Sequence, residues 1–294
     1  MDFKMNFSTT YFFIINLLFF SLSFYMNYLL KKKKKIIGDK DSNLNYYEKA
    51  YLYKGPNFIY NTIIAMILKV YGDGQVEIEK NIYKTKRGEE KVEFILKNLD
   101  DSQLDDGERR LFKTLFSLGN NEISTRQMDK LRRTEADNYN KKFNDFIFYL
   151  EDEMIEKKLF TKEKNSLKIF ISFVIFSLLF FVGIISVYNE KFFGVVSIVF
   201  SLYFYASLIS SFSKMTEAGN EKFRELEKKE EYLKSSKVNS EEDFLLAVGF
   251  GLKKELISNI YENLDDKKYE LFFDPDFYPS FKTALVGDHL LVRN

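Results

Sequence analysis

Long apolar runs alternate with stretches dense in charge along this chain. Three runs contain no Asp, Glu, Lys, Arg or His: residues 11–30, 169–188 and 192–212. About 20 helical residues, rising about 1.5 Å each, cross a hydrocarbon core of about 30 Å. Because lipid cannot hydrogen-bond the backbone, each run is predicted to be a transmembrane helix. Only Asn189 to Lys191 separate the last two, so these two are predicted to form a hairpin.

Basic residues beside the runs predict their orientation, because cytoplasmic flanks are enriched in Lys and Arg. Lys31–Lys35 follow the first run, and only Lys4 precedes it. The outer flanks of the hairpin carry Lys162, Lys164, Lys168, Lys214, Lys222 and Arg224. Both observations predict a multi-pass protein of the cell (inner/plasma) membrane. Residues 1–10 form a short extracytoplasmic tail, and the carboxy terminus is cytoplasmic.

A cleaved signal peptide is the alternative interpretation of the first run. Its apolar region of about 20 residues exceeds the usual length of about 7 to 15, and no small-residue cleavage site follows it. The run is therefore predicted to stay as an anchor in the lipid bilayer.

A basic juxtamembrane linker, residues 31–45, leads to a soluble domain predicted at residues 46–160. Apolar residues recur at helical spacing from about Asn57 to Val70, and glycines at 72 and 74 end this pattern. Two stretches of alternating residues follow, around Val76 and around Phe94, with a polar turn between them. A helix followed by a two-stranded ribbon is typical of winged-helix domains.

Two helix starts are visible in the rest of this domain. One helix is predicted to begin near Asp105 and to end at Gly119, a residue suited to a left-handed cap. Ser124 and Gln127 have the spacing of a capping box at the next helix. A long amphipathic helix from Tyr139 to Met154 completes a compact α+β unit with two winged-helix-like halves.

The cytoplasmic helical carboxy-terminal region is predicted at residues 213–294. Residues 215–234 read as a charged helix, and Ser240 is positioned to cap a second helix that continues to Ile260. Gly249 and Gly251 interrupt its apolar side, and close helix packing is the prediction for both. The predicted fold class is thus a membrane protein with three α-helical spans, a winged-helix-like α+β domain and a helical carboxy-terminal region.

Charge argues against nucleic-acid binding by this domain. The chain has 44 basic and 43 acidic residues, and residues 46–160 contain 20 basic and 21 acidic ones. A DNA-binding module should carry a clear basic excess. The basic cluster consists of Arg126, Lys130, Arg132 and Arg133, with Asp129 and Glu135 among them. A surface for a protein partner is preferred here, and a solvated face without a specific role is the alternative.

Candidate chemistry is sparse. The absence of Cys excludes disulfides, thiolate metal sites and cysteine nucleophiles. His289 is the single histidine, and the segment Asp274–Pro279 reads as a turn. The carboxylates Asp100, Asp101, Asp105, Asp106 and Glu108 lack the spacing of a calcium loop, so they are predicted to form a capping segment. No catalytic, cofactor-binding or metal residue is predicted.

The uncharged spans argue against a transport pathway. Their small residues are suited to helix contacts: Ser172, Ser177, Gly183, Gly194, Ser197 and Ser201.

The order of these elements resembles the carboxy-terminal half of the YciQ-like predicted membrane proteins, a family of uncharacterised function. The resemblance covers about residues 46–256. It is carried by FIYNTIIAMILKVYGDGQVEIEK (Phe58–Lys80), LDDGERRLFKTLF (Leu104–Phe116), TEAGNEKF (Thr216–Phe223), Tyr232 with Leu233, and FLLAVGFGL (Phe244–Leu252).

Thr216 and Gly219 match the family's Thr and Gly, but other positions depart from its pattern. Lys228 and Lys229 replace Gly-Phe, and Leu245 and Leu246 replace Pro-Tyr. The family's large extracytoplasmic β-rich domain is expected to be missing before the first span. The resemblance implies no catalytic residues.

The preferred function is a membrane-anchored interaction or regulatory module without catalytic activity, docking an unknown protein partner. An accessory subunit of a membrane transport or envelope complex is the alternative. A membrane-tethered DNA-binding regulator ranks third and an enzyme last. Homo-oligomerisation remains open.

Overall fold

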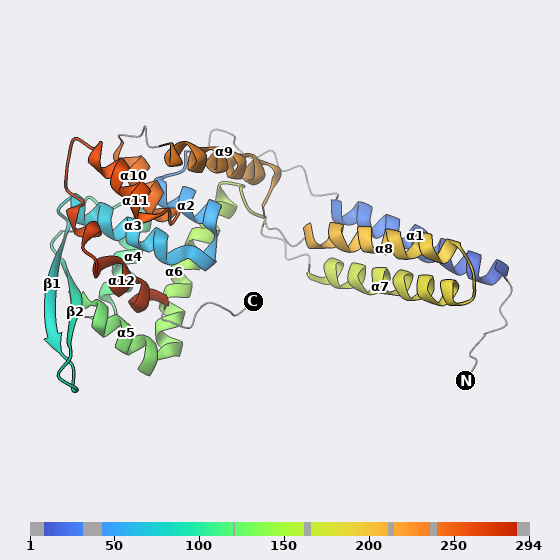
Figure 1. Cartoon of the computed structure of the whole chain (residues 1–294), viewed down its shortest axis with the longest axis horizontal. Helices are drawn as coiled ribbons and strands as arrows, with labels where there is room; N and C mark the ends of the chain where they lie inside the picture. The colour runs from blue at the N-terminus through green and yellow to red at the C-terminus, as the bar shows by residue number, and fades with distance from the viewer. Residues whose placement is uncertain are drawn as a thin grey trace. The chain divides into compact units, whose positions relative to one another are not determined.

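The computed structural model describes residues 9–31, 43–100, 102–119, 121–161, 166–210, 215–235 and 240–286 (Figure 1). It divides into two compact units. One unit comprises residues 1–39 and 158–220, and the other comprises residues 40–157 and 221–294. We call these the apolar unit and the charged unit. Each is described by itself.

Three helices form the apolar unit: α1 (Thr9–Lys31), α7 (Ser166–Tyr188) and α8 (Phe193–Ser210). α7 and α8 are joined by a short turn and pack on each other, and α1 packs on both. Met26, Phe176, Leu179 and Phe204 form the core of this bundle. Many outward side chains are also large and apolar, as at Phe170, which is 64% exposed.

Two helical stretches of this unit are long and apolar enough to cross a membrane, Thr9–Leu29 and Ile169–Tyr188. They coincide with the first two predicted spans. The third predicted span corresponds to α8, whose apolar stretch Phe193–Ala206 is shorter. Residues 211–212, at the end of that predicted span, lie outside the described part of the chain.

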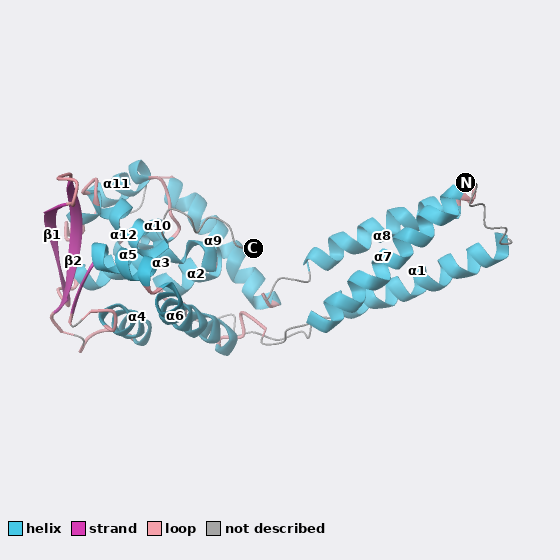
Figure 2. Cartoon of the chain, turned by 90° about the horizontal axis from the view of Figure 1, so that it is seen from below, coloured by secondary structure: helices cyan, strands magenta, loops and turns pink. Residues whose placement is uncertain are grey.

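The first part of the charged unit is mainly helical with a small sheet (Figure 2). Its elements are α2 (Tyr46–Lys54), η1 (Pro56–Phe58), α3 (Ile59–Gly72), β1 (Val76–Lys84), β2 (Glu90–Asn98), α4 (Asp106–Phe116), β3 (Glu122–Ser124), α5 (Thr125–Thr134) and α6 (Ala136–Glu156). The strands are antiparallel in the order β1-β2-β3. α3 is buried along most of its length because almost every residue from Asn61 to Val70 is apolar or small.

The carboxy-terminal elements belong to the same compact unit. They are α9 (Glu217–Lys234), which starts at the edge of the apolar unit, α10 (Glu241–Gly249), α11 (Lys254–Glu262), η2 (Glu270–Phe273) and α12 (Phe277–Val286). α10 packs on α2 and α3, and α12 packs on α5, α3 and β2. The rings of Phe277 and Phe281 lie 5.3 and 6.1 Å from that of Phe94 in β2. Residues 43–157 and 221–286 therefore share one hydrophobic core.

Three carboxylates on the carboxy-terminal elements pair with lysines of the first part. We call Glu230, Glu241 and Asp274 the seam carboxylates. Glu230 accepts from Lys54 at 3.2 Å, Glu241 lies 3.4 Å from Lys69, and Asp274 accepts from Lys80 at 2.8 Å.

Hydrogen bonding outweighs desolvation at all three seam carboxylates. Burial acts to raise the pKa of Glu230, but hydrogen bonds from Tyr53 and Lys54 hold that pKa below its ordinary value. The pKa of Glu241 and the pKa of Asp274 are lowered in the same way, by Tyr269 with Lys268 and by Lys80 respectively. The charged forms of these groups therefore stabilise the contact between the two stretches of sequence.

Several local predictions need correction. Helix α2 precedes the helix that was expected to open the domain. The helix expected to end at Gly119 ends at Phe116, and Gly119 is not left-handed. A side chain at Gly119 would instead lie 2.2 Å from the carbonyl oxygen of Glu122.

Two further corrections concern helix ends. Ser124 does cap α5, accepting from the Gln127 amide at 3.0 Å, but the Gln127 side chain turns to the carbonyl of Leu118 instead of completing a capping box. The helix expected to run from Ser240 to Ile260 is two helices, α10 and α11, because the chain turns at Gly251 with φ of 67°.

Candidate functional site

The distal half of the β1–β2 ribbon lies next to the start of α5. The Arg126 guanidinium lies 4.1 Å from the centre of the Tyr83 ring, a cation–π contact that links α5 to β1. Ile82 is 62% exposed, and its cross-strand partner Val92 is half-buried. We call residues 80–92 together with the exposed residues of α5 the ribbon surface.

All four residues of the predicted basic cluster lie on α5, but they differ in exposure. Arg126, Lys130 and Arg133 are exposed, at the spacing of one helical face. Arg132 is half-buried and donates to Asp129 at 2.6 Å. Arg133 also reaches Asp129, at 2.9 Å. One acidic residue therefore offsets two of the four basic ones.

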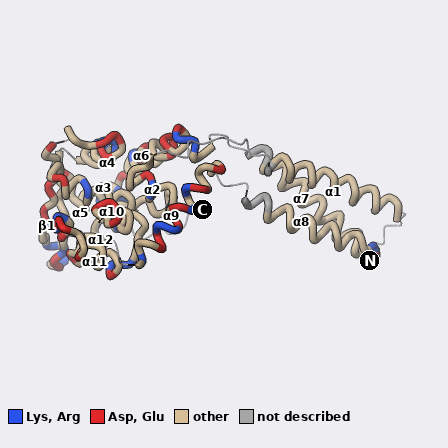
Figure 3. Tube along the Cα trace, turned by 90° about the horizontal axis from the view of Figure 1, so that it is seen from above, with Lys and Arg blue, Asp and Glu red and all other residues tan. Residues whose placement is uncertain are grey.

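Basic and acidic residues are interspersed along the chain throughout the charged unit (Figure 3). Lys97 pairs with Glu79 across the ribbon, and Lys84 lies 3.9 Å from Glu90. Such a mixture lacks the basic excess that binding to phosphates needs.

Two carboxylates of the predicted acidic group cap helices. Asp105 accepts from the Glu108 amide at 2.8 Å, and Glu108 accepts from the Asp105 amide at 3.2 Å, a complete capping box for α4. A second box, Asn45 with Glu48, caps α2. Asp100 and Asp106 are engaged locally, with Ser102 and Arg109, and Asp101 lies outside the described residues.

The two capping boxes are joined by buried tyrosines. Tyr46 donates to Glu108 at 3.0 Å, and Tyr47 donates to Asp105 at 3.1 Å. Burial, together with the nearby Asp105 carboxylate, raises the pKa of Glu108. A Cβ at Gly107 would meet the Tyr47 hydroxyl at 2.3 Å, so the DDGE sequence of α4 is fitted to these rings. The cluster fixes α2 against α4.

Other residues singled out in the sequence have structural positions. Asp274 accepts from the Asp276 amide at 2.9 Å, as expected for a turn, and both carboxylates hold Lys80. Gly249 packs closely, as predicted, because a Cβ there would lie 2.8 Å from that of Ala50. His289 lies outside the described residues.

Thr216 and Gly219 tie together the two segments that lead to α7 and from α8. The Thr216 hydroxyl donates to the carbonyl of Lys158 at 2.7 Å and accepts from the Gly219 amide at 3.0 Å. The Thr216 amide donates to the carbonyl of Leu159 at 2.9 Å. A Cβ at Gly219 would lie 2.2 Å from that carbonyl oxygen. We call residues 158–160 and 215–219 the neck.

Polar side chains link all three helices of the apolar unit. Asn16 donates to Ser186 at 2.7 Å and accepts from Ser197 at 2.6 Å, and all three residues are buried. Gly183 and Gly194 let α7 and α8 approach closely here. Ser201 donates to a carbonyl of its own helix. The prediction that small residues of these runs make helix contacts is confirmed at Ser177, Gly183, Gly194 and Ser197. The role of Asn16 was not predicted.

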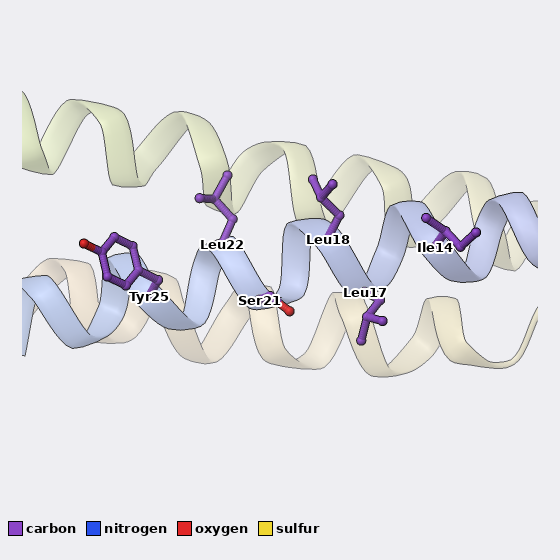
Figure 4. A pocket seen from close by; sticks show the side chains of 6 residues that line it. All are labelled: Ile14, Leu17, Leu18, Ser21, Leu22 and Tyr25. Atoms are coloured by element: carbon purple, nitrogen blue, oxygen red, sulfur yellow. The ribbon is translucent and has the colours of Figure 1, made fainter.

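An open groove of about 520 Å³ runs along the outer face of α1 (Figure 4). Its lining residues all come from this one helix: Ile14, Leu17, Leu18, Ser21, Leu22 and Tyr25. It has no convergent polar groups, so it lacks the features of a small-molecule site.

Ile82 and the neck residues Lys158 and Leu159 were also missed by sequence reasoning. The alternation of Val76, Ile78 and Ile82 along the strand could have identified Ile82. No local pattern announces the neck, since its bonds join residues far apart in the chain.

Comparison with known proteins identifies a family. The family described as "Predicted membrane protein (DUF2207) C-terminal domain" matches residues 48–246. No curated protein and no solved structure matches the chain.

Proposed function

Since the chain belongs to the DUF2207 family of predicted membrane proteins, with residues 48–246 matching its carboxy-terminal domain, we propose that it is a membrane-anchored protein-interaction module. The ribbon surface is the docking face, and the module has no catalytic activity of its own. The family match and the apolar helices support a place in the membrane.

The anchor in this proposal consists of three spans, residues 11–30, 169–188 and 192–212. Lysines flank the cytoplasmic ends, so the amino terminus is outside and the charged unit is in the cytoplasm. Because the chain has no Cys, single cysteines introduced into it are clean reporters. An impermeant thiol reagent should label Lys191→Cys in intact cells and Ser102→Cys only after permeabilisation. The reverse pattern would overturn this orientation.

The docking role rests on one observation. The charged unit presents an exposed apolar residue, Ile82, beside exposed basic residues of α5 and interspersed acids. A mixed surface with an apolar anchor fits a protein interface. A surface of mixed charge is poorly suited to a polyanion such as DNA. The membrane-tethered DNA-binding regulator is therefore the less favoured function.

Crosslinking in native membranes tests the docking role. A partner should be captured by the wild-type protein and lost when Arg126, Lys130 and Arg133 are all changed to Glu. The matched control changes Lys253, Lys254 and Lys282, all exposed and outside the ribbon surface, to Glu. Equal capture by both triple variants would sink the proposal. DNA binding that weakens steeply with salt would favour the regulator instead.

The accessory-subunit alternative draws on a different surface. The groove on α1 exposes Ser21 among apolar side chains, which is a feature of helix contacts within membranes. Capture that survives the α5 triple variant but is lost on Ser21→Phe would favour this reading.

A further inference from the structure

β1 is an edge of its sheet. Within the described residues the strand order is β1-β2-β3, and no strand pairs with the far side of β1. Figure 1 shows the nine-residue strand at the outer side of the charged unit. Such an edge presents unpaired backbone N–H and C=O groups that can pair with another chain.

The hydrogen-bond pattern shows which residues of β1 carry those groups. The Thr85 amide donates to Glu89 at 2.8 Å, and the Leu99 amide donates to Gln75 at 3.0 Å. Both pairs continue the register of the ladder at its two ends. Alternate pairs exchange bonds in an antiparallel ladder, so the odd-numbered residues of β1 face β2. The backbone groups of Ile82 and Lys84 therefore lie on the open edge.

The apolar face of the ribbon extends beyond its cover. Val76 and Ile78 are buried, and α12 covers Phe94, which is opposite Lys80. The next pair on this face is Ile82 with Val92. Ile82 is 62% exposed, whereas the two apolar residues before it on this face, Val76 and Ile78, are buried. An added strand at the edge would bring a side chain beside it.

We propose that the open edge of β1 binds an extended segment of a partner protein as a fourth, antiparallel strand. This deepens the docking role and rests on it. The segment carries an apolar residue opposite Ile82 and a carboxylate opposite Lys84, whose side chain is 74% exposed. A partner segment is favoured over a second copy of this chain because it can supply the carboxylate on the added strand itself. Pairing Ile82 with Ile82 of another copy would place Lys80 opposite Lys84, so that strand would bring no carboxylate of its own there, and the two carboxylates near Lys80, Asp274 and Asp276, belong to another segment.

A labelled peptide tests the proposal on the full-length protein in detergent micelles. The peptide has nine residues, mainly Thr, with Val and Glu at the positions facing Ile82 and Lys84. The control peptide has the same composition with Val and Glu exchanged. Fluorescence anisotropy should show tighter binding of the first peptide. Hydrogen exchange should slow at least about tenfold at the amides of Ile82 and Lys84, and not at Tyr83, whose amide already faces β2.

Ile82→Pro removes the backbone N–H of residue 82 from the open edge and keeps the hydrogen bonds between β1 and β2. Amide exchange in β2 shows whether those hydrogen bonds are intact. Binding should weaken about tenfold, whereas the matched variant Ile82→Val should bind like the wild type. If Ile82→Pro disturbs β2, Lys84→Pro takes its place, since its amide also faces outward.

Equal binding of the two peptides, equal binding to the proline variant, or protection at Tyr83 in place of its neighbours would overturn the edge-strand proposal. So would a dimer of the full-length protein that Ile82→Pro dissociates, because β1 would then pair with a second copy. Each result leaves the docking role to be judged separately by crosslinking with the α5 triple variants.

Discussion

Adding a methyl group at Gly249 is expected to destabilise the charged unit. Gly249 ends α10 and packs on Ala50 of α2, and both are buried. The new Cβ would lie 2.8 Å from that of Ala50, whereas ordinary contacts begin at 3.4 Å. The helices must separate by about 0.6 Å, and overpacking of this kind costs about 1–3 kcal/mol. Alanine returns at most about 1 kcal/mol of helix propensity, so Gly249→Ala should lose about 1–2 kcal/mol.

A compensating change makes this prediction sharp. Ala50→Gly alone loses about 1 kcal/mol of propensity and about 0.8 kcal/mol for the buried methyl. In the double variant the methyl merely moves from one helix to the other, so it should lose less than the sum of the single losses. The expected coupling is about 1–2 kcal/mol. The matched control is Ala65→Gly, because its Cβ lies 3.9 Å from the added one, an ordinary contact.

Urea unfolding of the full-length protein in detergent, followed by tyrosine fluorescence, measures these differences. The chain has 19 Tyr and no Trp, so the signal comes from tyrosines such as Tyr46, Tyr47 and Tyr51 in buried positions of α2. A Gly249→Ala variant within about 0.5 kcal/mol of the wild type would refute the packing argument. Rescue by Ala65→Gly as large as that by Ala50→Gly would refute its assignment to the α10–α2 contact.

Three further outcomes are expected. Asn16→Ala should destabilise the apolar unit by about 0.6–2 kcal/mol, because two buried hydrogen bonds are lost. Ser23→Ala should leave stability unchanged, because the buried Ser23 hydroxyl has no partner among the described residues. Thermal unfolding in micelles compares the two variants. Lys158→Gly should raise stability by about 0.5–1 kcal/mol in the same assay, because Lys158 has φ of 59°, which glycine adopts without strain. The seam carboxylates have lowered pKa values, so their stabilisation is present above the ordinary values of 4.5 for Glu and 3.8 for Asp and is lost as pH falls below them. The protection factors of amides in residues 240–286, that is, the intrinsic exchange rate at each pH divided by the observed rate, should therefore fall below about pH 4.5 before those of α3. Protection factors that fall when the pH is raised from 5 to 7 would contradict the sign.

Local sequence signals predicted much of the fold. The helix start near Asp105, the cap at Ser124 and the alternation around Val76 and Phe94 each depend on residues a few positions apart, and the structure confirms those elements. Helix α2 was not predicted because its sequence, YYEKAYLYK, has no clear apolar face. It is buried by packing against α10, α3 and α6, contacts that periodicity does not encode.

Long-range contacts account for the rest of what was missed. Nothing near Glu230 or Asp274 indicates that each pairs with a lysine far earlier in the chain, 176 and 194 residues away respectively. The ribbon was predicted, but the exposure of Ile82 depends on where α12 ends its cover. The Asn16 contact likewise joins residues about 170 positions apart. Local sequence patterns identify such residues but not the distant residues that they contact.

The neck joins the two ends of the segment that contains α7 and α8. A hydrogen bond of 2.9 Å joins Thr216 to Leu159, so the chain that leaves for α7 and α8 returns to the point of departure. The ends of the intervening stretch thus lie side by side, as the two ends of a domain inserted into a surface turn do. A short turn would be enough to join Leu159 directly to Thr216. Deleting the hairpin in this way would leave the order of the flanking helices α6 and α9 unchanged.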